Sequence, residues 1–219
     1  MEISESFEAS AAVREDSILS QIKRRGDTIV FAGDYIWMAM FSQYFDRAYP
    51  QPSFNVNDLD TLDIEASGDI IREIELGNFT LLLGHVIGVD HAGHTFSASH
   101  SEIERKLNDT EEIIKEIISR MSEDTTLLVF GDHGMTDDGN HGGASQNELR
   151  SVLFAYSKRG FPMRADAMYE RMPVKQLDLA SIVSHILALP LPFSNLGVIH
   201  PLFARSSQSL KDAQGEAVQ

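Results

Sequence analysis

One apolar stretch decides the fold: it runs from Phe79 to Val89 and consists of FTLLLGHVIGV. Because its residues are apolar on both faces, it predicts a strand inside a parallel sheet rather than one with a solvated face. Similar short runs at Thr28–Ala32 (TIVFA) and Thr125–Gly131 (TTLLVFG) predict two more buried strands, and Val152–Tyr156 predicts a fourth. The core of the protein is therefore expected to be a sheet.

Helix-like segments alternate with these strands. Apolar residues at helical spacing predict helices at 13–25, 34–45, 64–76, 101–121 and 177–189. Residues 49–63, with several Pro, Asn and Asp, predict a loop. The alternation indicates an α/β sandwich with a largely parallel sheet. We expect residues 1–203 to form one catalytic-type domain and residues 204–219, which have few large apolar side chains, to be a disordered tail.

Composition excludes several classes of protein. The chain has 219 residues, with 18 basic and 33 acidic side chains and a net charge of −15. Such an acidic surface repels phosphate backbones, so nucleic acid is not expected as a partner. Cysteine is absent, which excludes disulfides and thiolate metal sites. No apolar run reaches the roughly 18 residues that span a bilayer, and the acidic first residues do not resemble a secretory signal.

Two segments rich in Asp, His and Gly, which we predict to be loops, each follow a predicted strand. The first is Asp90–His100, within GVDHAGH, and the second is Asp132–Ser145, within GDHGM and NHGG. Sites in open α/β sheets form at the carboxyl ends of strands, so we expect both segments at one edge of the sheet.

These segments contain five candidate metal ligands. Their Asp and His donors, without Cys, suit Zn²⁺ or Mn²⁺. The alternative is a pair of Gly-rich turns with capping Asp and solvated His residues; two such segments behind two strands favour the metal site. The candidates are Asp90, His94, Asp132, His133 and His141.

GVDHAGH and GDHGMTDDGNHGG resemble the alkaline-phosphatase superfamily. More narrowly, the sequence is similar to the GPI ethanolamine phosphate transferases, most closely those that modify the third mannose of the GPI precursor. The segments FNVNDLDT and LPLPFSNLG carry this narrower resemblance, which covers roughly residues 15 to 203.

The resemblance implies an alkaline-phosphatase-like α/β fold with two divalent metal ions, usually zinc. Asp90, His94 and His141 would bind one ion, and Asp132 and His133 would bind the other. His91 would contact the ligands without binding metal itself, or it would face the substrate. The implied reaction moves phosphoethanolamine from phosphatidylethanolamine to a mannose of the GPI precursor. The resemblance further implies the lumenal face of the endoplasmic reticulum membrane and a small membrane-protein stabilising subunit.

The sequence departs from the family pattern at its amino-terminal end. In the family, the nucleophilic Thr and one metal-binding Asp precede the segment that matches Val13–Phe31, and membrane spans flank the domain. We therefore expect a fragment with an incomplete fold, one incomplete metal site, no catalytic nucleophile and little transferase activity by itself. Two other functions stay open: a soluble metal-dependent phosphodiesterase and a non-catalytic metal-binding remnant.

Overall fold

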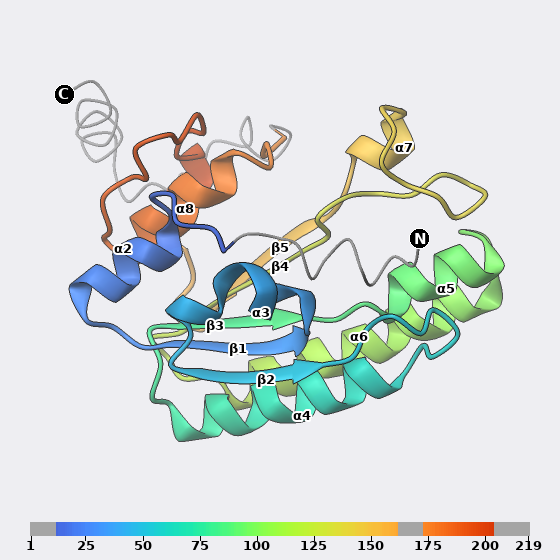
Figure 1. Ribbon diagram of the computed structural model, residues 1–219, viewed down its shortest axis with the longest axis horizontal. Helices are drawn as coiled ribbons and strands as arrows, with labels where there is room; N and C mark the ends of the chain where they lie inside the picture. Colours follow the sequence, from blue (N-terminus) through green and yellow to red (C-terminus); the bar gives the residue numbers. More distant parts are fainter. Residues whose placement is uncertain (1–11, 162–172, 204–219) are drawn as a thin grey trace. The chain divides into compact units, whose positions relative to one another are not determined.

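The computed structural model describes residues 12–161 and 173–203 (Figure 1). These residues form two compact units. The first unit contains residues 12–14, 27–122 and 130–152, and the second contains residues 15–26, 123–129, 153–161 and 173–203. The predicted tail at 204–219 lies outside the described residues. Within the described ranges, no helix is both long and apolar enough to cross a membrane.

The first unit is built on a parallel sheet of three strands in the order β2-β1-β3. They are β1 (Ile29–Asp34), β2 (Arg47–Gln51) and β3 (Leu81–His85). The prediction of an α/β fold with a parallel sheet is confirmed. The central strand is β1, all of whose residues are buried.

The position predicted for the Phe79–Val89 strand was wrong. Among the described strands, β3 pairs with β1 alone, and most of its residues are only half-buried. A run that is apolar on both faces shows that both faces are covered, but it does not show which strand has neighbours on both sides. Here β1 takes the central place.

Helices cover the sheet (Figure 1). The helix α4 (Thr61–Leu76) packs against all three strands and ends, as predicted, at Gly77, whose φ is 62°. The short helix α3 (Ile36–Phe41), followed by the 3₁₀ turn η1 (Ser42–Tyr44), packs on β1 through Trp37, whose ring stacks on Phe31 at 5.6 Å.

Two segments predicted as loops are regular elements. The first, at the start of 49–63, belongs to the strand β2, where Pro50 is tolerated because β2 lies at the sheet edge. The second, Asp90–His100, is largely the helix α5 (Gly88–Phe96). Its first N–H groups are capped by Asp63 of α4, a tertiary contact that a local pattern does not reveal.

The long helix α6 (Ser101–Arg120) is confirmed. His100 caps its start, because His100 Nδ1 accepts the N–H of Glu102 at 3.2 Å. The segment that follows β4 is irregular, as predicted, until α7 (Gln146–Leu149).

The second unit contains the paired strands β4 (Thr126–Phe130) and β5 (Leu153–Ser157). Its helices are α2 (Ile18–Arg25), α8 (Asp178–Ile186) and the 3₁₀ turn η2 (Pro201–Phe203). Helix α2 begins later than the predicted Val13, because Ser17 and Ser20 form a reciprocal capping box there.

Candidate metal centre

Helix α5 carries the first two candidate ligands. Asp90 and His94 are four residues apart, so they lie on the same face of the helix. The Nε2 atom of His94 is 3.4 Å from Asp90 Oδ2. Both side chains are largely covered but still reach solvent, as a site open to substrate requires.

The second loop (Asp132–Ser145) brings His141 to the same place. Its Nε2 atom lies 3.3 Å from Asp90 Oδ1 and 3.1 Å from His94 Nε2. Two imidazole nitrogens and a carboxylate therefore face one another, although His141 is separated from α5 by a whole helix and strand. The convergence expected from the sequence is present for these three side chains.

His133 joins this group through its ring, which stacks on that of His141 at 3.8 Å between centroids. Its Nδ1 lies 2.9 Å from the carbonyl of Gly134, to which it donates as the Nδ1–H tautomer. That tautomer leaves Nε2 free to bind a cation. Ligand atoms of Asp90, His133 and His141 all lie within 4.8 Å of one another.

Asp132 lies beside His133 but outside that three-residue group. Its Oδ1 accepts the backbone N–H of His133 at 3.1 Å and is 3.7 Å from His133 Nε2. Four of the five predicted ligands thus lie together, since Asp90, His94 and His141 are in direct contact and His133 stacks on His141. The fifth, Asp132, contacts His133.

A divalent cation fits this donor set. The Oδ1 atom of Asp90 is buried and accepts no hydrogen bond from the described residues, since His141 Nε2, although 3.3 Å away, is not aligned to donate to it. A buried carboxylate oxygen without a donor is costly, and a cation between it and neutral imidazole nitrogens would satisfy it. Nitrogen and oxygen donors without sulfur are those of hydrolytic zinc or manganese sites. The superfamily expectation of metal dependence is therefore consistent with these residues.

Glycines bring the second loop onto α5. A Cβ on Gly139, whose φ is +85°, would lie 2.0 Å from the carbonyl oxygen of Gly93. A Cβ on Gly93 would lie 2.1 Å from the sulfur of Met135. At Gly139 the Cβ would meet backbone atoms, so the close approach of the loop to the helix requires glycine there, whereas at Gly93 the flexible end of Met135 would have to shift.

The end of the second loop is held by Glu148, which the sequence analysis overlooked. Its carboxylate accepts the backbone N–H groups of Gly143 at 2.7 Å and Ser145 at 3.0 Å. These donors, with the Ser145 hydroxyl first, lower the pKa of Glu148. The signal was present as a Ser-x-x-Glu capping box over 145–148.

His91 points to a different part of the unit. It is buried, and its Nδ1 lies 3.1 Å from the carbonyl oxygen of Asp58. It contributes no atom to the three-residue ligand group. Its role behind the ligands or toward the substrate stays a prediction.

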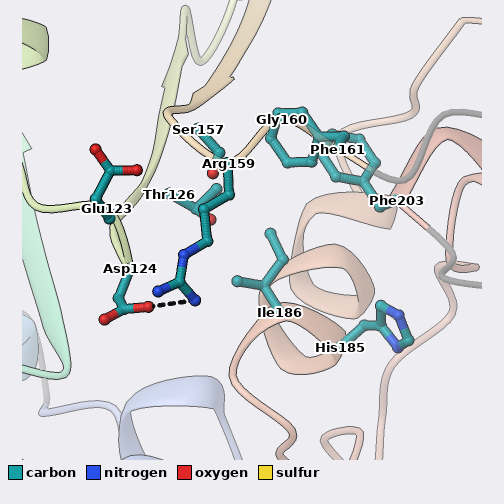
Figure 2. A pocket seen from close by; sticks show the side chains of 10 residues that line it. All are labelled: Glu123, Asp124, Thr126, Ser157, Arg159, Gly160, Phe161, His185, Ile186 and Phe203. Carbon is teal, nitrogen blue, oxygen red and sulfur yellow. Dashed lines mark ion pairs between the residues drawn. The ribbon is translucent and has the colours of Figure 1, made fainter.

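The second unit has a pocket of its own, of about 230 Å³ (Figure 2). That volume is below the roughly 300–1,000 Å³ of typical ligand sites. Figure 2 shows the Arg159 guanidinium directed at Asp124, with which it forms an ion pair at 2.6 Å. The charge of Arg159 is thus already compensated, and we assign no function to this pocket.

Comparison with known proteins identifies relatives. Residues 5–153 match the family model described as type I phosphodiesterase / nucleotide pyrophosphatase. The chain is 38% identical over 203 residues to the human "GPI ethanolamine phosphate transferase 3, catalytic subunit", covering 92% of this chain and 18% of the relative.

Two fungal relatives extend this result. The chain is 35% identical over 210 residues to GPI ethanolamine phosphate transferase 3 of Schizosaccharomyces pombe, covering 94% of this chain and 23% of the relative. It is 32% identical over 218 residues to GPI ethanolamine phosphate transferase 2 of Aspergillus fumigatus, covering 93% and 28%. The chain thus spans about a fifth to a quarter of the length of these relatives, and the type 3 proteins have the higher identity.

Proposed function

Because this chain belongs to the type I phosphodiesterase / nucleotide pyrophosphatase family, we propose that its Asp and His cluster serves the transfer of phosphoethanolamine from phosphatidylethanolamine to a mannose of the GPI precursor. The observation that carries the proposal is the convergence of Asp90, His94 and His141. The names of the relatives supply the transferred group, ethanolamine phosphate, and GPI as its acceptor. Phosphatidylethanolamine as donor and mannose as the site of attachment come from the resemblance to the family.

The proposed cofactors are two divalent ions, zinc in both positions. Asp90, His94 and His141 hold one ion, and Asp132 and His133 take part in holding the other. Ions held by these residues would supply positive charge to phosphoryl oxygens and would lower the pKa of an attacking hydroxyl.

The chain's own residues arrange the donors. The Gly134 carbonyl orients the ring of His133, and α5 presents Asp90 and His94 side by side. We assign no nucleophile among these residues. The Thr95 hydroxyl donates to the carbonyl of Val56, and the Thr136 hydroxyl donates to the carboxylate of Asp138.

The proposed setting follows from the resemblance to the GPI ethanolamine phosphate transferases. We infer that the domain works at the lumenal face of the endoplasmic reticulum membrane. Phosphatidylethanolamine and the GPI precursor are both lipids, so a domain that acts on them works at a membrane surface. A small membrane-protein stabilising subunit is the proposed protein partner.

The test is zinc-dependent binding of the donor headgroup. Calorimetric titration of the zinc-loaded chain with glycerophosphoethanolamine should give binding that is absent without zinc. His141→Ala should lose both zinc and headgroup, whereas Lys115→Met, an exposed change on α6, should behave as the unaltered chain. Headgroup binding that ignores zinc, or its absence from the zinc-loaded chain, would contradict the proposal.

A second candidate is phosphodiester hydrolysis, which the description of the matching family favours. It predicts zinc-dependent release of nitrophenol from bis(p-nitrophenyl) phosphate. The two reactions are distinguished with phosphatidylethanolamine labelled in its headgroup and a mannolipid acceptor. Hydrolysis would release the labelled headgroup into solution, whereas transfer would attach it to the acceptor. Transfer by the chain alone would also show that a nucleophile lies within it.

A further inference from the structure

One face of α5 is attached to the segment Val56–Asp63, here called the anchoring segment. Thr95 donates its hydroxyl to the Val56 carbonyl at 3.0 Å, and the Nδ1 of His91 lies 3.1 Å from the Asp58 carbonyl. Gly88, His91 and Thr95 are spaced by three and four residues, so they form one stripe of the helix. The ligands Asp90 and His94 lie on a different stripe. The anchoring segment therefore sets the rotation at which α5 presents its ligands.

The first turn of α5 is held by a single buried carboxylate. Asp63 Oδ1 accepts the backbone N–H of Ile87 at 2.9 Å and that of Gly88 at 3.1 Å. A carboxylate at the positive end of a helix makes strong, charge-assisted bonds of this kind. Because Asp63 belongs to α4, these hydrogen bonds fix the start of α5 relative to α4.

The other oxygen of the same carboxylate faces a buried lysine. Lys106 Nζ, on α6, lies 2.8 Å from Asp63 Oδ2 and 3.2 Å from Asp60 Oδ1. The Lys106 and Asp63 side chains are only 2% and 4% exposed. Arg105 donates to Asp60 and lowers the pKa of the Asp60 carboxyl.

The backbone of α5 is closely packed at Gly88. A Cβ on Gly88 would lie 2.2 Å from Lys106 Cε and 2.4 Å from the Leu59 carbonyl oxygen. The backbone of α5 thus rests directly on the ion pair and on the anchoring segment.

Stability alone is a weak reason for such a pair. Burying two charges costs several kcal/mol, and apolar replacements of buried ion pairs are often no less stable. What an apolar pair cannot supply is an acceptor that holds two N–H groups of α5 in fixed positions.

We propose that Asp63 and Lys106 are positioning residues of the metal centre, which hold the first turn of α5 so that Asp90 and His94 meet His141. The inference deepens the proposed function and rests on it for the identity of the metal site. Neither residue is proposed to touch the metal.

The test compares two buried ion pairs of the same unit. Asp63→Leu with Lys106→Met removes the charges next to α5 and also the oxygen that accepts the N–H groups of Ile87 and Gly88. Arg47→Met with Glu73→Gln removes the other pair, in which Glu73 is fully buried and α5 is not involved. We expect the first double variant to bind zinc roughly ten- to a hundredfold more weakly, as changes behind metal ligands do, and the second to keep the original zinc Kd.

Amide hydrogen exchange gives a readout that needs no metal. Residues 87–96 should exchange faster in the Asp63/Lys106 variant and at the original rate in the Arg47/Glu73 variant. Unchanged exchange over 87–96 in the Asp63/Lys106 variant, or equal loss of zinc affinity in both variants, overturns the inference. If the unaltered chain takes up no zinc, the proposed function fails and exchange still decides this inference. Should the double variant not fold, Asp63→Asn alone is measured instead. It keeps an oxygen acceptor but loses the charge that pairs with Lys106, so residues 87–96 should exchange faster than in the unaltered chain, and an unchanged rate overturns the inference.

Discussion

Replacing Gly88 by alanine tests how tightly α5 is seated. The new Cβ would lie 2.2 to 2.4 Å from three atoms of Lys106, Asp63 and Leu59. Carbon contacts are normally about 3.5–4.0 Å apart, so the helix must move by more than 1 Å or unfold locally. Overpacking of this kind costs about 1–3 kcal/mol, and the loss of charged hydrogen bonds from Asp63 adds about 1.5–3 kcal/mol. We therefore expect a loss of about 2.5–6 kcal/mol in the free energy of unfolding.

The matched control is Gly68→Ala, in the exposed part of α4, where a Cβ meets no atom within 4 Å. It should stabilise the protein by about 0.5–1 kcal/mol through helix propensity. Trp37, the one tryptophan of the chain, lies in the first unit, so its fluorescence during urea unfolding reports on this unit. Equal midpoints for Gly88→Ala and Gly68→Ala would refute the close packing described for α5.

Two further changes test other contacts. Arg47 donates to Glu73 and holds the pKa of that carboxyl below its usual range. The pair therefore adds stability above the unfolded-state pKa that disappears as pH falls through the lower folded-state pKa. Glu73→Gln should lower the free energy of unfolding by about 2 kcal/mol at neutral pH. It should also make this free energy, measured by urea unfolding, fall less steeply as the pH is lowered, and an unchanged pH dependence would contradict this. Gly139→Ala should displace the second loop from α5 and weaken zinc binding in a titration, whereas Gly142→Ala, also at positive φ but with open space around it, should leave the zinc Kd unchanged. Equal effects of the two alanines would argue against a steric cause.

The sequence predicted correctly those helices whose length or end is determined by residues within the helix or next to it. The end of α4 at Gly77 and the length of α6 depend on helical spacing and a positive-φ glycine, both visible in the sequence. The α/β class followed from the alternation of these elements with apolar runs. The order of the strands did not, because an apolar run records burial and not the identity of its neighbours.

The site was predicted in its residue types but not in its construction. Asp90 and His94 were expected on a loop, yet they lie on a helix whose start depends on Asp63, far away in the sequence. Lys106 gave no signal, since a lysine within an amphipathic helix normally predicts a solvated face. Contacts between distant side chains are what a local pattern cannot supply.

Zinc titration of the unaltered chain against His141→Ala, with His100→Ala as the histidine control outside the cluster, tests the central claim most directly. If Asp90, His94 and His141 share an ion, removing one ligand should weaken the zinc Kd by on the order of a hundredfold or more, given about 10–16 kcal/mol for a complete site of four ligands. His100→Ala should bind as the unaltered chain does. Equal zinc affinity in all three proteins would contradict the claim that the two segments converge on a metal ion.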